Sequence, residues 1–168
     1  MARLRCTEKL LRAMGGAYLR QAGEDTAPEQ PDDWYANLIW LDGRKCVLFT
    51  HVATRFPIVV FDTPASRLRD LSAILRESYI ATLDKLEVSR AHAATELLKM
   101  GHPSLARTCN RSVLATMNEY AADIAMSVKE SGGIARADAT VTSLRTAESP
   151  ASALGGTSPI DAVRKRLS

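Results

Sequence analysis

The chain has 168 residues, the usual size of one globular domain and enough to bury a hydrophobic core without disulfides or metal. Hydrophobic residues make up 46% and charged residues 24%, close to the averages of folded proteins, which excludes wholesale disorder. No apolar run approaches the roughly 18 residues that cross a bilayer, and an apolar core does not follow the basic N-terminus. We therefore expect neither a membrane-spanning helix nor an export signal.

The net charge of +3 is distributed unevenly along the chain. Residues 132–168 hold five basic and three acidic side chains, which leaves a net charge of +1 on residues 1–131. A nucleic-acid-binding domain usually carries a concentrated basic face. The near-neutral body therefore disfavours nucleic acid as the partner, while a local basic patch stays open.

The first third of the chain is predicted to hold one strand, one helix and a loop. A short strand is expected over residues 4–7, and a helix over residues 8–14 that Gly15 and Gly16 end. Residues 21–33 are rich in Gly, Pro, Glu and Asp and contain few apolar side chains. This composition is typical of a surface loop.

The strongest local pattern is a β-hairpin over residues 34–51. Two aromatic and aliphatic runs, 34–41 and 44–50, flank Asp42 and Gly43, and an Asp-Gly pair favours a type I′ turn. The second run is apolar on both faces, so we expect it to be covered on both sides. Residues 58–61 are expected to form a third strand.

Three helices are predicted after the hairpin. In the first, Thr63 is the expected N-cap, Pro64 occupies the first helical position, and leucines recur at helical spacing up to about residue 84. The second is expected over residues 89–100 and the third from about residue 110 to 131, both ended by glycine. Residues 105–109 fit either a strand or a loop.

The C-terminal segment, residues 132–168, has a different composition. It is rich in Ala, Ser, Thr and Gly and lacks aromatic side chains, so it buries little apolar area against its ordering entropy. We therefore expect one α+β domain over residues 1–131, followed by a flexible tail. Residues 158–167 fit a short amphipathic helix with Ser158 as its cap, which docks on the body or binds a partner; a frayed end is the alternative.

The predicted fold class is α+β. A small, mainly antiparallel sheet built on the 34–51 hairpin is expected to be packed by about three helices.

The start of the third helix is the most suggestive site for chemistry. Asn110, Arg111 and Ser112 stand where free N–H groups and the helix dipole favour an anion, and an arginine there can clamp a phosphate or a carboxylate. The alternative is structural, with Asn110 or Ser112 as the N-cap and Arg111 paired with an acid. Asn118 projects from a similar side as Arg111, over the small residue Ala115, which indicates either a pocket or close helix packing.

Arg44 and Lys45 follow the hairpin turn. They are interpreted either as solvated charges or as members of one phosphate-binding patch with Arg111.

The hairpin also holds three aromatic residues, Trp34, Tyr35 and Trp40. Aromatic residues on strands can stack on bases, but here they alternate with aliphatic residues, which favours core packing. Trp34 lies next to Asp32 and Asp33 and is expected to be the most exposed of the three.

Histidines and cysteines give no pattern for metal or nucleophilic chemistry. The three histidines lie far apart, and the three cysteines, each among apolar neighbours, have no C-x-x-C spacing. We expect buried, reduced thiols in a cytoplasmic protein, with no metal, no cofactor and no catalytic residue.

Three stretches together resemble a family of small bacterial proteins known only as a domain of unknown function: WYANL at 34–38, RKCVLFT at 44–50, and NRSVL at 110–114 running on to Asn118. The resemblance covers about residues 3–130. It implies a fold and a bacterial cytoplasmic origin, and it implies no activity.

Two functions remain open from the sequence. The first is a non-enzymatic binding or regulatory protein, of mobile-element or defence context, that binds a protein partner through its helices or its tail. The second is an unrecognised enzyme or a nucleotide-binding protein, with Arg111, Asn118, Lys45 and Arg44 around an anionic ligand.

Overall fold

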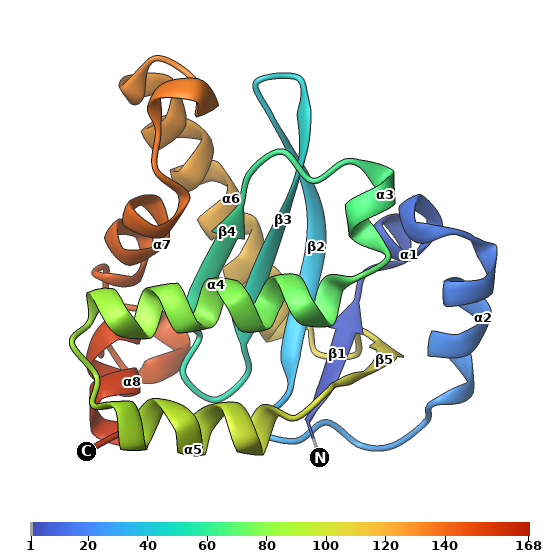
Figure 1. The fold of residues 1–168 in the computed structure, drawn as a ribbon, viewed down its shortest axis with the longest axis horizontal. Helices are drawn as coiled ribbons and strands as arrows, with labels where there is room; N and C mark the ends of the chain where they lie inside the picture. The colour runs from blue at the N-terminus through green and yellow to red at the C-terminus, as the bar shows by residue number, and fades with distance from the viewer. Residues whose placement is uncertain (1) are drawn as a thin grey trace.

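The computed structural model describes residues 2–168, which form one five-stranded mixed sheet with helices on both faces (Figure 1). The strand order is β4-β3-β2-β1-β5. The strands are β1 (Arg3–Cys6), β2 (Trp34–Leu41), β3 (Arg44–His51), β4 (Pro57–Val60) and β5 (Ser104–Arg107). The α+β prediction is confirmed.

The mainly antiparallel sheet is a prediction that the structure corrects. β1 runs parallel to both of its neighbours, β2 and β5, while β2–β3 and β3–β4 are antiparallel. Parallel strands need a long crossover, and α1 (Glu8–Met14), α2 (Gly16–Glu24) and the loop over residues 25–33 supply it between β1 and β2. The prediction lacked α2, because Gly15 alone ends α1 and Gly16 begins the next helix.

The predicted β-hairpin and its type I′ turn are confirmed. Asp42 and Gly43 both have positive φ, 56° and 72°, as a type I′ turn requires, and Leu41 pairs with Arg44.

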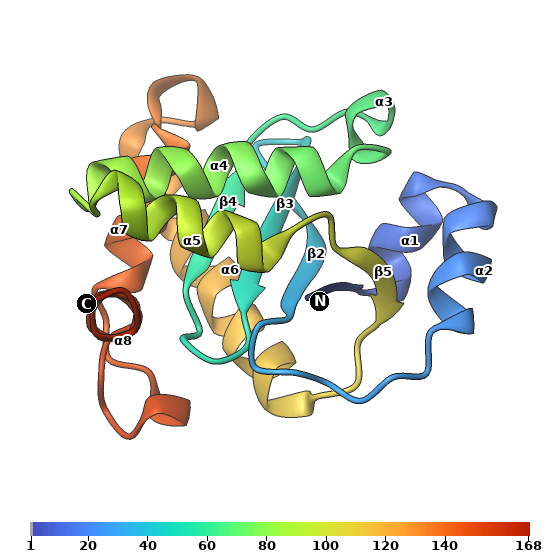
Figure 2. The ribbon, with the colours of Figure 1, turned by 60° about the horizontal axis from the view of Figure 1, so that its bottom comes forward.

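Both faces of the hairpin are buried, as predicted for its second strand. Side chains of Trp34, Ala36 and Leu38 join one core with α1, α4 (Leu71–Lys85) and α5 (Arg90–Met100). Tyr35, Ile39 and Leu41 join the other core, which α6 (Arg111–Ser131) covers. Figure 2 shows α4 and α5 on one side of the sheet and α6 on the other.

The residue range after the third strand holds two helices instead of one. A single turn, α3 (Ala65–Leu68), is separated from α4 by a break at residues 69–70. Thr63 is not the N-cap, because its N–H and its hydroxyl both donate to the carbonyl of Lys45. The structure therefore has more helices than the three predicted, eight α-helices within residues 2–168.

The glycines predicted to end the two later helices, Gly101 and Gly132, are confirmed. Ser89 caps α5 by accepting from the N–H of His92, and Gly101 ends it. Asn110 caps α6, and Gly132 ends it in the left-handed conformation. Residues 104–107 between these helices form β5, which decides the alternative for this segment in favour of a strand.

The flexible tail is a further point at which the structure differs from prediction. Residues 132–168 hold α7 (Ala139–Ala147), α8 (Pro159–Arg166) and two short 3-10 helices, Ile134–Arg136 and Ser152–Leu154. In α7, the hydroxyl of Ser143 accepts a hydrogen bond from the N–H of Val59 at 2.9 Å, so α7 closes the edge of β4. Small Ala, Ser and Thr side chains allow this close approach, which composition alone does not reveal.

The C-terminal helix docks on the body, one of the alternatives raised from the sequence. Ser158 caps α8, and Ile160, Val163 and Leu167 enter the main core. Arg166 pairs with Asp32 and Glu96, which ties α8 to the 25–33 loop and to α5.

Trp34 is buried, whereas the sequence indicated that it would be the most exposed aromatic residue. Its ring makes edge contacts with Tyr79 and His51 at centroid distances of 5.1 and 4.9 Å. The Nδ1 atom of His51 accepts a hydrogen bond from the N–H of Thr54 at 3.2 Å. Burial, and then the charge of Arg166, lowers the pKa of His51 to about 3.

Within residues 2–168, none of the helices has both the length and the apolar character that a bilayer-spanning segment needs.

Because α8 docks on the body, truncating two valines of the C-terminal segment is expected to lower the free energy of unfolding by different amounts. Val163 is 1% exposed and Val141, on α7, is 43% exposed. We expect Val163→Ala to lower the free energy of unfolding by about 2 kcal/mol, because it leaves a cavity, and Val141→Ala to change it by less than about 0.5 kcal/mol. Urea unfolding measures both; equal, negligible effects would mean that the segment does not dock.

Buried His51 predicts an acid sensitivity. Its folded pKa of about 3 lies below the ordinary value of 6.5, so only the unfolded chain takes up this proton between those pH values, and stability falls as the pH drops through that window. We expect His51→Asn to show a shallower loss of unfolding free energy between pH 6.5 and 4. His102→Asn, at an exposed position, is the control that keeps the full slope. Parallel slopes in the two variants would contradict the assignment.

Candidate functional site

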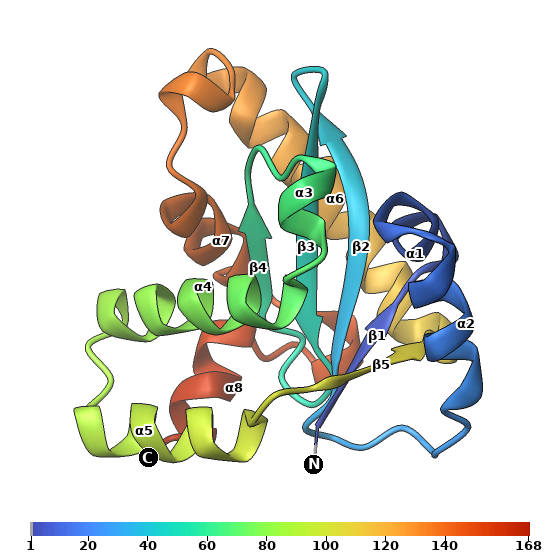
Figure 3. The ribbon, with the colours of Figure 1, turned by 45° about the vertical axis from the view of Figure 1, so that its right-hand side comes forward.

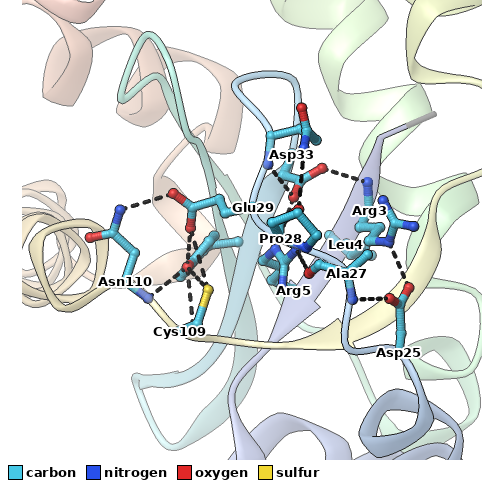
Figure 4. Close-up of polar contacts among 12 residues, drawn as sticks. Arg3, Leu4, Arg5, Asp25, Ala27, Pro28, Glu29, Asp33, Cys109 and Asn110 are labelled. Carbon is cyan, nitrogen blue, oxygen red and sulfur yellow. Dashed lines mark hydrogen bonds and ion pairs between the residues drawn. The ribbon is translucent and has the colours of Figure 1, made fainter.

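A buried ion pair organises the segments around the site. Arg5 on β1 donates from Nε to the Oδ2 atom of Asp33 at 2.8 Å, and both side chains are almost fully buried. The two outer nitrogens of the same guanidinium donate to the carbonyls of Arg107 and Ala27 at 3.1 and 3.0 Å. Arg5 therefore connects β1, the loop after α2 and the end of β5; Figure 4 shows Arg5 beside Ala27 and Asp33 of the loop.

The carboxylate of Asp33 is satisfied on every side. Besides Arg5, it accepts from the N–H of Arg3 at 2.9 Å and from the N–H of Gln30 at 3.0 Å. These bonds hold the 25–33 loop against the sheet, where Glu29 meets Tyr35.

The hydroxyl of Tyr35 is the centre of a polar cluster at the start of α6. It accepts from the N–H groups of Cys109 and Asn110 at 3.2 and 2.9 Å and donates to the Oε2 atom of Glu29. The other oxygen of Glu29 accepts from the side-chain amide of Asn110 at 2.9 Å (Figure 4). Burial and the Glu29 carboxylate raise the pKa of Tyr35, so the phenol keeps its proton. Its hydroxyl joins Glu29 to the backbone at the start of α6.

The three predicted residues at this helix start have separate roles. The side-chain oxygen of Asn110 accepts from the N–H groups of Ser112 and Val113, which is the capping alternative. Arg111 and Ser112 are exposed. Within residues 2–168, Arg111 forms no ion pair, so the alternative in which an acid neutralises it is not realised.

Arg55 reaches the same helix start from the turn between β3 and β4. Its side chain is only 9% exposed, one outer nitrogen donates to the carbonyl of Val52, and the other lies 3.4 Å from the hydroxyl of Ser112. Its Nε atom is buried and has no hydrogen-bond partner, and no carboxylate of residues 2–168 pairs with it. Its backbone is also in the left-handed region, with φ of 55°, where its carbonyl accepts from the hydroxyl of Tyr120 at 2.7 Å.

Arg44 and Lys45 lie at the opposite end of α6. Beside them, Asp42 accepts from the N–H of Ile134, just past the C-terminus of α6. A helix of 21 residues spans about 30 Å, so the structure does not bring these two basic residues together with Arg111. Arg44 pairs with Asp62 at 3.2 Å, and the Nζ atom of Lys45 lies 5.9 Å from the ring centre of Trp40.

Asn118 lies two turns into α6 from Arg111. Asn118 and Ala115 are both exposed, so no helix of residues 2–168 packs over this side. The close-packing alternative is therefore wrong, and Asn118 faces solvent.

Sequence reasoning missed Arg55, Glu29 and Tyr35 as members of the site. Tyr35 was assigned to the core, correctly for its ring, but its hydroxyl reaches the helix start. Arg55 and Glu29 stand in segments without regular structure, where spacing predicts no partner. The capping pattern at Asn110 was the one sequence feature that located this site at the start of α6.

Comparison with family models gives one match. The model described as Domain of unknown function (DUF6933) covers residues 3–162. The chain belongs to this family. No curated protein and no solved structure shows significant similarity to it.

The DUF6933 match extends through α7 into α8, beyond residue 130 where the resemblance was expected to end. The helices that composition assigned to a flexible tail are thus part of the DUF6933 family region. The family description carries no activity.

The cysteines of this DUF6933 chain differ in their surroundings. All three are free thiols; Cys6 and Cys46 are buried as predicted, whereas Cys109 is exposed beside Tyr35. Among residues 2–168 there is no group of three His, Cys, Asp or Glu side chains arranged to hold a metal ion.

The Arg5–Asp33 pair predicts a large effect of removing one charge. Asp33→Asn leaves the buried guanidinium without its counter-charge, and we expect it to lower the free energy of unfolding by about 3 kcal/mol or more. Glu8→Gln breaks the exposed Glu8–Arg12 pair on α1 and is the control, with a loss below about 0.5 kcal/mol. Chemical unfolding of both variants tests this, and similar losses would refute the anchoring role.

Proposed function

We propose that the protein is a small binding protein that holds an anionic group, a phosphate or a carboxylate, at the start of α6. The observation that carries this proposal is the buried guanidinium of Arg55, which has no carboxylate partner within residues 2–168. An unpaired buried charge costs free energy, so it needs a compensating ligand or partner.

The surroundings of Arg55 support an anion. The positive end of the α6 dipole lies beside it, and Arg111 and the hydroxyl of Ser112 stand exposed at the same place. Asn110 already engages two N–H groups of the first turn, so Arg55 and Arg111, instead of the helix N–H groups, would supply the main contacts.

The remaining sequence hypotheses are narrowed by this geometry. Arg44 and Lys45 are left out of the anion site, and we assign no catalytic residue; the hydroxyl of Ser112, 3.4 Å from Arg55, is proposed to contact the anion. We keep as proposals a bacterial cytoplasmic location and a regulatory role with a protein partner. The apolar face of α8 is packed in the core, so a partner surface is better sought elsewhere.

Thermal unfolding with added anions tests the proposal. Inorganic phosphate, pyrophosphate and citrate are the probes, each compared with sodium chloride at the same ionic strength. At 100 times its dissociation constant, a bound ligand stabilises the folded chain by about 2.7 kcal/mol, so at least one probe is expected to raise the melting temperature.

Variants locate the effect. We expect Arg55→Met to weaken the best probe at least tenfold, and Arg111→Gln to weaken it less, because Arg111 is exposed. Arg44→Gln, at the far end of α6, is the matched control with unchanged binding. Without ligand, Arg55→Met is expected to cost no more than about 1 kcal/mol, because it also removes an unpaired buried charge. A chain that no probe stabilises beyond sodium chloride, or an Arg55→Met variant that responds like the wild type, would show that the site binds no anion.

A further inference from the structure

The outer face of the α4–α5 pair carries exposed apolar side chains. Leu98 on α5 is 82% exposed and Ile80 on α4 is 48% exposed, although both are large apolar residues. Ala91 and Ala94 of α5 are exposed beside Leu98, at helical spacing. Figures 1 and 3 show the two helices side by side at the surface. Exposed apolar patches of this kind mark interaction surfaces.

A mostly apolar hollow lies on the same face. It has a volume of about 320 Å³, and the side chains that line it include Ala73, Arg76, Ile80 and His102. The hollow is therefore formed by the first half of α4 and the end of α5. Leu98 precedes His102 by one helical turn, so it stands beside the hollow without filling it.

Arg76 sets the register between the two helices. Its Nη1 atom donates to the carbonyls of Leu97 and Gly101 at 3.0 and 2.7 Å. Leu98, which follows Leu97 on α5, is therefore level with the hollow along the helix axes.

The outer sides of the two helices carry complementary charges. On α4, the exposed acids Glu77 and Asp84 recur with Ile80 at helical spacing, so they share its outer side. The single acid of α5, Glu96, is 5% exposed and paired with α8, whereas Arg90 is exposed. Within residues 2–168, Glu77, Asp84 and Arg90 form no ion pair. The outer side of α4 is therefore acidic, and that of α5 is basic.

A two-fold rotation brings these complementary parts together. When the axis is parallel to the helices, the rotation places α5 of one copy on α4 of the other and keeps each residue at its level. Leu98 of one copy then faces the hollow of the other. Arg90 faces Asp84, because both lie at the end of the pair where α4 leads into α5. Each contact is made twice, and the small side chains Ala91 and Ala94 let the helices approach closely.

We propose that the outer face of α4 and α5 is a dimer interface, in which two copies of this chain pack these helices around a two-fold axis. The face lies on the side of the sheet opposite α6, so the dimer leaves the anion site open. Because α5 is about 16 Å long, the interface lies at the small end of specific contacts. We therefore expect a dissociation constant on the order of 10–100 µM.

Sedimentation equilibrium of the full-length chain tests the proposal, over a concentration series that reaches about ten times the upper value. We expect Leu98→Glu to weaken dimerisation at least about tenfold, because it places a carboxylate against the apolar hollow. Met126→Glu on α6, where Met126 is 60% exposed, is the matched control with unchanged dimerisation. Both positions are exposed, so neither substitution removes core packing.

An exchange of charges tests the two-fold arrangement itself. Asp84→Arg and Arg90→Asp each bring like charges together in a homodimer, so each variant alone is expected to dimerise at least about tenfold more weakly. In an equal mixture, both contacts of the heterodimer join opposite charges, so dimerisation should return. Asp84 is in the last turn of α4 and Arg90 in the first turn of α5, so both substitutions suit the helix dipole and both variants are expected to fold.

Three results would overturn the proposal. A chain that stays monomeric at every concentration would leave this face to a different protein. A dimer that forms equally well with Leu98→Glu would have its interface elsewhere. A mixture of the two charge variants that stays monomeric, while the wild type dimerises, would rule out the packing of α5 on α4.

Discussion

The pairing of Arg5 with Asp33 is the constraint on which the rest of the functional end depends. The guanidinium of Arg5, on β1, has hydrogen-bond partners in two other segments, the 25–33 loop and the end of β5. By holding the loop, it presents Glu29 to Tyr35. By holding the end of β5, it fixes the direction in which the chain enters α6.

Arg55 is a second buried arginine and lies at the start of α6, but its charge is not paired. Arg5 donates to one carboxylate and two carbonyls, whereas Arg55 donates to one carbonyl, lies 3.4 Å from one hydroxyl and has an unpaired Nε. It also adopts positive φ, a conformation that costs about 1 kcal/mol for a side chain of this kind. Costs of this sort are typical of functional positions, where stability is given up for binding.

The features predictable from the sequence were those set by neighbouring residues. The Asp42-Gly43 turn, the glycine ends of α5 and α6 and the apolar stripe of α6 all arise from interactions within a few positions, so local patterns report them. The parallel pairing of β1 depends on residues about 30 and 100 positions away, which no local pattern contains.

The candidate site was predicted in the same uneven way. Asn110 and Arg111 were found because the start of a helix can be recognised in the sequence. The hypothesis that Lys45 joins Arg111 failed because the sequence does not show that these residues lie at opposite ends of the 21-residue helix α6. Arg55 and Glu29 were missed because their partners are set by tertiary contacts, here with Ser112 and Asn110.

The hydroxyl of Ser143 has a consequence for the order in which the protein is made. β4 is complete once residue 60 has been synthesised, but the helix that closes its edge lies about 80 residues later in the chain. A nascent chain ending near residue 131 exposes an unpaired strand edge and lacks the core side chains of α8. Such chains are prone to aggregate, so synthesis of α7 and α8, and not completion of the sheet, protects this edge from self-association.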